Sequence, residues 1–167
     1  MRKRTQSREL ALQVVYQLDL RGAEVLDQID DLLGEQTKDP EVIAFARDLV
    51  QGTWEHKKAI DQTIEAVAKN WEIKRMAAID RNVLRVATFE LLYREDIPAL
   101  VSINEAIDIA KKYSTPKSGK FVNGILDNIR LTAAPPSKRG PGGLARPIPG
   151  PDEPSQPPQP PQPPQPS

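Results

Sequence analysis

Residues 80–129 carry three successive stripes of apolar side chains at the three-to-four spacing of an α-helix, separated by two sharp connections. The first of these stripes includes Val83, Leu84 and Leu91 and is the most apolar in the chain. Similar helical spacing recurs upstream, beginning with residues 8–20, and no segment alternates with the period of a strand. We therefore expect an all-α fold of about seven helices joined by short connections.

Several helix ends are predicted by local chemistry. Asp39 and Pro40 form an N-cap followed by proline at the first helical position, and Gly22 is typical of the residue after a helix. Ser102 and Glu105 have the spacing of a capping box, which predicts a helix that begins at Ser102.

The last part of the chain has a different composition from the rest. Residues 135–167 hold 14 of the 17 prolines and end in a proline–glutamine repeat. Such a segment has too few apolar side chains to offset the entropy lost on ordering. We expect one helical domain at residues 1–134 and a disordered Pro/Gln-rich tail at residues 135–167.

Composition disfavours several classes of protein. The chain has no cysteine and a single histidine, so disulfides, thiolate metal sites and a histidine-rich metal site are not expected. No apolar run approaches the length of about 20 residues that spans a bilayer, and none follows the basic N-terminus as in a signal peptide. We expect a cytoplasmic protein without membrane association, cofactor, metal or catalytic centre.

Charge is distributed unevenly along a chain of zero net charge. Arg2, Lys3, Arg4 and Arg8 lie close together at the N-terminus, whereas the remaining body is mildly acidic. Guanidinium groups match phosphate oxygens in a two-pronged geometry, so these cations are candidates for an anionic partner. From composition alone, an ordinary solvated terminus is the favoured explanation.

Four short segments carry a resemblance to a known family. They read ELLY, DIP, SINEAIDIAKKY and KFVNGILD, and they lie at Glu90–Tyr93, Asp96–Pro98, Ser102–Tyr113 and Lys120–Asp127. Together with the first and central helical stripes, they resemble the NusB family of bacterial transcription antitermination factors over about residues 4–129.

This resemblance implies a fold of two packed helical bundles and a non-enzymatic adaptor function. The expected ligand is the boxA RNA of ribosomal RNA operon leaders. The expected protein partner is ribosomal protein S10, with which the protein would form a heterodimer. RNA polymerase and other Nus factors would be indirect partners. A homodimer of the free protein stays possible.

The resemblance also suggests which residues bind RNA. The candidates are cations, ring side chains that unpaired bases stack on, and one amide: Arg2, Lys3, Arg4, Arg8, Tyr16, Lys117, Lys120, Phe121 and Asn123. For Tyr16 and Phe121, and for Tyr113, burial at the edge of the core is the competing interpretation.

The polar positions of the central helix are the candidates for the S10 interface. They are Asp80, Arg81, Arg85, Thr88 and Glu90, which we expect on its outward face. A solvated helix face is the competing interpretation. Two other functions remain open: an RNA-binding accessory domain related to those of ribosomal RNA methyltransferases, and a purely protein-binding helical scaffold.

Overall fold

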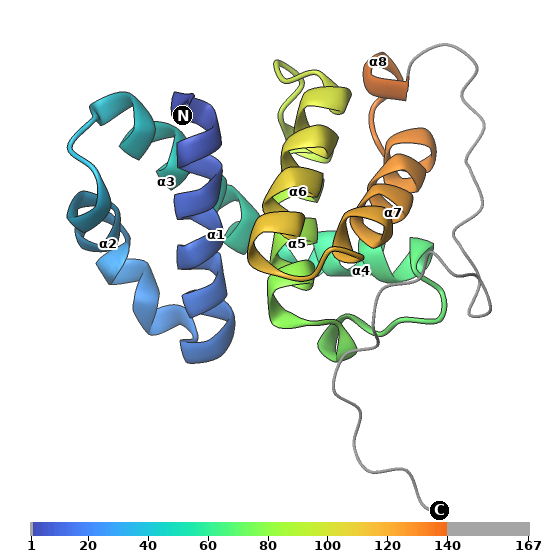
Figure 1. The fold of residues 1–167 in the computed structure, drawn as a ribbon, viewed down its shortest axis with the longest axis horizontal. Coiled ribbons are helices and arrows are strands. Elements are labelled where there is room, and N and C mark those ends of the chain that lie inside the picture. The colour runs from blue at the N-terminus through green and yellow to red at the C-terminus, as the bar shows by residue number, and fades with distance from the viewer. Residues whose placement is uncertain (1, 140–167) are drawn as a thin grey trace, which may run out of the picture.

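The apolar stripes assemble eight α-helices and two short 3-10 segments into two bundles, within residues 2–139 that the computed structural model describes (Figure 1). The first bundle contains α1 (Lys3–Arg21), the 3-10 segment η1 (Ala23–Gln28), α2 (Ile29–Gln36) and α3 (Pro40–Glu55). The second contains α4 (Lys57–Val67), the 3-10 segment η2 (Ile73–Arg75), α5 (Ala78–Tyr93), α6 (Ala99–Tyr113), α7 (Ser118–Thr132) and α8 (Pro136–Arg139). The all-α, two-bundle expectation is confirmed.

Helix α5 is the central element, because it packs on α1 and α3 of the first bundle and on α4, α6 and α7 of the second. Its fully buried Leu84 and Leu91 share one core with Leu18, Leu49 and Ile125 from the other helices. Burying each such side chain stabilises the fold by about 2 kcal/mol.

The two bundles are in close contact where α3 packs on α5. A Cβ atom placed on Gly52 would lie 2.1 Å from Cζ of Phe89. A glycine at this position therefore makes room for the Phe89 ring, which no helix-propensity argument predicts.

The predicted ends of two helices are confirmed. Oδ1 of Asp39 accepts a hydrogen bond of 3.0 Å from the backbone N–H of Glu41, with Pro40 at the first position of α3. Gly22 follows α1 with φ 89°, a conformation that favours glycine.

The predicted capping box is wrong. Helix α6 begins at Ala99, directly after Pro98, so Ser102 lies one turn inside it. The hydroxyl of Ser102 donates to Oε1 of Glu90 (2.7 Å), and the carboxylate of Glu105 accepts from Thr5 on α1. Both side chains therefore bind distant helices instead of closing the end of their own helix.

The packed structure also extends past the expected domain boundary. Residues 136–139 form α8 against α7, and Nζ of the buried Lys138 donates to the backbone carbonyl of Glu90 at 2.6 Å. The expectation that the tail begins at residue 135 is wrong for these residues. The expected disorder of residues 140–167 lies outside the described part of the chain.

Candidate RNA and partner surface

The N-terminal cations belong to α1 and face two different neighbours. The helix begins at Lys3, one turn before the expected start, and its first turns lie between α3 and α6. Arg2 points toward Glu105 of α6, whereas Lys3 pairs with Asp39 and Glu41 at the start of α3. The cations that the sequence places together are thus divided between two faces.

Arg4 is the third exposed cation of this group. Its guanidinium lies 4.3 Å from the ring centroid of Phe45 on α3, and it forms no ion pair within residues 2–139. Stacking on a ring leaves the edge of a guanidinium open to acceptors. Arg2, Lys3 and Arg4 remain accessible, and their RNA-binding role stays a prediction.

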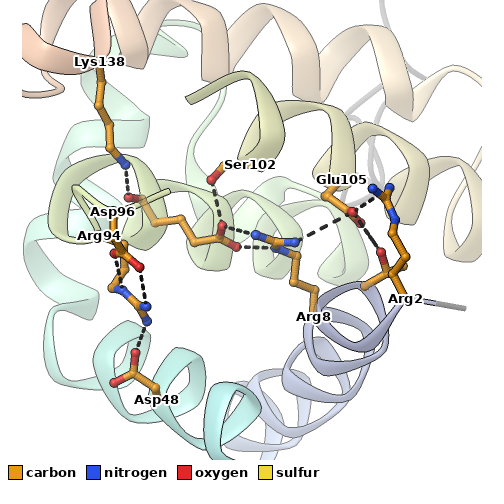
Figure 2. Close-up of polar contacts among 10 residues, drawn as sticks. Arg2, Arg8, Asp48, Arg94, Asp96, Ser102, Glu105 and Lys138 are labelled. Carbon is orange, nitrogen blue, oxygen red and sulfur yellow. Dashed lines mark hydrogen bonds and ion pairs between the residues drawn. The ribbon is translucent and has the colours of Figure 1, made fainter. Parts of the chain in front are cut away.

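Arg8 was expected to bind RNA, and the structure shows that it is inaccessible. Its side chain is 4% exposed, and its Nε and Nη2 atoms donate to the two carboxylate oxygens of Glu90 at 2.9 and 2.8 Å. Figure 2 shows this guanidinium between α1 and α6, with Ser102 and Glu105 nearby. The fork that matches a phosphate is therefore occupied by an internal carboxylate.

A second group of cations gathers where α6 ends and α7 begins. Lys117 and Lys120 are exposed, as is Asn123, and the three-residue spacing puts them along one side of α7. Exposed Lys111 joins them, because its side chain lies against Gly119. None of these lysines forms an ion pair within the described residues, so their charges are available to an anionic ligand.

The ring side chains divide into buried and accessible ones. Phe121 is buried and meets Trp71 edge-on, with ring centroids 5.4 Å apart, so its expected role as an RNA platform is wrong for this conformation. The competing interpretation, burial as part of the apolar stripe that Phe121 begins, is correct, because burial of the ring is favourable. Tyr16 is half-buried on α1, and Tyr113 exposes 40% of its surface at the end of α6.

The polar residues of α5 do not form an outward face. Asp80, Arg85, Thr88 and Glu90 are all buried, and Arg81 is half-buried. The expectation that these five residues present a surface to S10 is therefore wrong for four of them.

The charged members of this set have partners on other helices. Arg85 binds both carboxylate oxygens of Asp61 on α4 at 2.8 and 3.0 Å. It also pairs with Asp19 of α1 at 3.2 Å, as Arg81 does at 2.7 Å. The two pairs with Asp19 bridge the bundles, whereas the pair with Asp61 lies within the second bundle. Sequence spacing cannot distinguish such a residue from a solvated one.

Asp80 holds the connection between α6 and α7. Its carboxylate accepts a hydrogen bond of 3.2 Å from the hydroxyl of Ser118, the first residue of α7. Burial raises the pKa of the Asp80 carboxyl, and hydrogen bonds from Ser114 and Ser118 partly oppose this shift. Asp80 thus supports the loop that carries Lys117.

One accessible apolar patch lies at the start of α6. Leu100 and Val101 are 63% and 43% exposed. They adjoin a groove lined by residues 95–100 together with Arg130, Ser137 and Lys138. Exposed apolar side chains beside a groove are typical of a protein-binding surface.

Several other features bear on the class of protein. Within residues 2–139, no three His, Cys, Asp or Glu side chains are grouped to hold a metal ion. No helix in this part of the chain is long and apolar enough to cross a bilayer. The single histidine, His56, stacks on Tyr93 with ring centroids 4.0 Å apart.

Sequence reasoning missed the polar contacts that join α1 to α6. They are made by Thr5, Glu9, Glu105, Lys112 and Tyr113, of which only Glu105 and Tyr113 were singled out, each for a different role. Their helical periodicity offered a weak indication, since Glu105 and Lys112 are seven residues apart and share one side of α6.

The fold and this surface define a helical binding protein. Two bundles are joined by buried ion pairs, and lysines with no ion pair inside residues 2–139 lie at one end of α6 and α7. Residues 5–130 match the NusB family, and the chain belongs to this family.

Relatives and solved structures agree with this assignment. The transcription antitermination protein NusB of Anaeromyxobacter dehalogenans is 48% identical over 143 residues, which cover 83% of this chain and 96% of that protein. A structure of NusB from T. maritima is 40% identical, covers 83% of this chain and 96% of that one, and superposes with a TM-score of 0.73. A crystal structure of antitermination factors NusB and NusE in complex with double-stranded RNA is 33% identical, covers 77% and 96%, and has a TM-score of 0.70.

Proposed function

We propose that this protein is a transcription antitermination factor that binds the boxA RNA of ribosomal RNA leaders together with ribosomal protein S10 (NusE). It acts in the cytoplasm as an adaptor without catalysis, and the assembled complex joins RNA polymerase and other Nus factors. The observation that carries the proposal is family membership over residues 5–130, together with the solved complex of NusB, NusE and RNA on the same fold.

The accessible cations support the RNA part of this proposal. Lys111, Lys117 and Lys120 gather at one end of α6 and α7, beside Asn123, and the exposed Tyr113 ends α6. Cations supply affinity for the phosphate backbone, and an exposed ring and an amide supply contacts to unpaired bases. We place the RNA on this surface, with Arg2 at its far end along α6.

The exposed apolar patch supports the protein part. We propose that S10 contacts Leu100 and Val101 at the start of α6, in place of the buried residues of α5. The groove beside this patch also includes Glu95 and Asp96, which suit a basic ribosomal protein.

The test is a fluorescence-anisotropy titration of labelled boxA RNA, with and without S10, against a scrambled RNA of equal length. The proposal expects weak binding by this protein alone, tighter binding with S10 and discrimination against the scrambled RNA. Equal affinity for the two RNAs in the presence of S10 would contradict the RNA proposal and favour a purely protein-binding scaffold.

A further inference from the structure

Two carboxylates are buried beneath the cations that border α1 and α6. The first is Glu105 of α6, which accepts hydrogen bonds from the hydroxyl of Thr5 at 2.8 and 3.1 Å. Nη2 of Arg2 lies 3.5 Å from the same carboxylate, and Nη1 of Arg8 lies 3.8 Å from it (Figure 2). The side chain of Glu105 is 10% exposed, whereas that of Arg2 is 88% exposed.

The second carboxylate is Glu9 of α1. It lies about two helical turns further along the contact between α1 and α6, which we call the seam. Nζ of Lys112 donates to Oε1 of Glu9 at 2.9 Å, and the hydroxyl of Tyr113 donates to the same oxygen. These hydrogen bonds to Glu9 raise the pKa of both the Lys112 ammonium and the Tyr113 hydroxyl. Again the carboxylate is buried and the cation above it is half-exposed.

Each pair places an anion where a phosphate of bound RNA would otherwise lie. Carboxylate and phosphate oxygens make the same charge-assisted hydrogen bonds to guanidinium and ammonium groups. An RNA phosphate that binds Lys112, or the edge of Arg2 that faces Glu105, therefore displaces a carboxylate already bound there or approaches it against repulsion. Lys111, Lys117 and Lys120 have no such partner within the described residues.

We infer that Glu9 and Glu105 are affinity-determining residues for RNA, which occupy the anion positions of Lys112 and Arg2 in the unbound protein and yield them to RNA phosphates. This inference rests on the proposed RNA-binding function. The internal carboxylates weaken binding of any polyanion at the seam, so only an RNA held by further contacts takes up these two cations. The seam thereby limits nonspecific RNA binding by the protein alone.

The test compares Glu9→Gln and Glu105→Gln with Glu35→Gln in boxA and scrambled RNA titrations. Glutamine keeps the size and the acceptor oxygen but removes the charge. Glu35 is an exposed residue of α2, which packs on α1 and α3, so its variant controls for the change in net charge. A unit charge at about 8 Å corresponds to about twofold in affinity at the dielectric constant of water and about tenfold at a dielectric constant of about 30.

The inference predicts a gain of this size for Glu9→Gln and Glu105→Gln, largest for scrambled RNA, and no gain for Glu35→Gln. Each cation that a seam variant frees to bind an RNA phosphate should steepen the salt dependence. For single-stranded RNA, the slope of log affinity against log salt concentration should become more negative by about 0.7. Unchanged or weaker binding by both seam variants would show that the carboxylates merely orient the cations, and the inference would be overturned.

A second measurement uses the unmodified chain, in case a variant does not fold. The Cζ resonance of each tyrosine, from the ring carbon that carries the hydroxyl, is observed by NMR in ¹³C-tyrosine-labelled protein. The chain has three tyrosines, so the spectrum has few resonances to assign. At saturating boxA RNA the Tyr113 resonance shifts as its bond to Glu9 is lost, and a Tyr113 resonance unchanged at saturation overturns the inference. If the unmodified protein binds no RNA even with S10, the proposed function itself has failed, which is a different outcome.

Discussion

The buried pair of Arg8 and Glu90 predicts a large loss of stability when one partner is removed. Arg8→Met keeps the length of the side chain but deletes both hydrogen bonds to Glu90, whose side chain is 1% exposed. Among the described residues, only the hydroxyl of Ser102 then remains as a side-chain donor to that carboxylate. An uncompensated buried charge of this kind costs about 3–5 kcal/mol in the free energy of unfolding.

This loss is a large fraction of the stability of an ordinary domain, about 5–15 kcal/mol. For a domain of this size it lowers the thermal midpoint by roughly 10–20 °C. The assay is urea and thermal unfolding followed by circular dichroism at 222 nm.

Two further variants make the measurement decisive. Arg47→Met removes an exposed pair with Asp30 and should cost less than about 1 kcal/mol. The double variant Arg8→Met with Glu90→Leu removes both buried charges and should recover most of the loss. If Arg8→Met were no more harmful than Arg47→Met, the pair would not be the internal clamp that the structure describes.

Three other predictions concern single residues. Gly52→Ala forces a Cβ atom into the Phe89 ring and should cost about 2–4 kcal/mol in urea unfolding, whereas Gly34→Ala, with nothing within 4 Å, should be neutral or stabilise by up to about 1 kcal/mol. Burial pushes the pKa of the Asp19 carboxyl upward, but the hydrogen bonds from two α5 side chains and the charges of two arginines outweigh it, so the folded pKa lies below the ordinary value. Asp19 therefore contributes stability that is complete above about pH 4 and is lost as the pH falls toward the folded pKa. The thermal midpoints of the unmodified chain and of Asp19→Asn should converge at acid pH. A gap between the two midpoints that stays constant with pH would contradict this. Lys120→Ala should weaken boxA and scrambled RNA alike and reduce the salt slope by about 0.7, and an unchanged slope in anisotropy titrations would remove Lys120 from the RNA surface.

Local chemistry predicted the helices well, because each stripe and cap depends on neighbours within a few residues. The Asp39 cap and the Gly22 end both appear in the structure as expected. The apolar stripe that includes Phe121 was also correct, and its burial is the reason that this ring is inaccessible.

The roles of the charged residues could not be predicted from spacing. Arg8 and Glu90 are 82 positions apart, and Arg85 meets Asp61 across 24 positions. A charged residue with a buried partner has the same local sequence as one in water, so Arg8 resembled a surface cation until the helices were placed. Glu9 escaped notice for the same reason.

RNA and S10 are expected to bind this protein cooperatively, so each should raise the affinity of the other by the same factor. Isothermal titration of S10 into the protein, with and without saturating boxA RNA, gives the factor by which RNA raises S10 affinity. This factor should equal the factor by which S10 raises RNA affinity, within a typical range of about 5–150-fold. Cooperative binding predicts two equal factors above one, whereas an S10 affinity that is the same with and without RNA would rule it out.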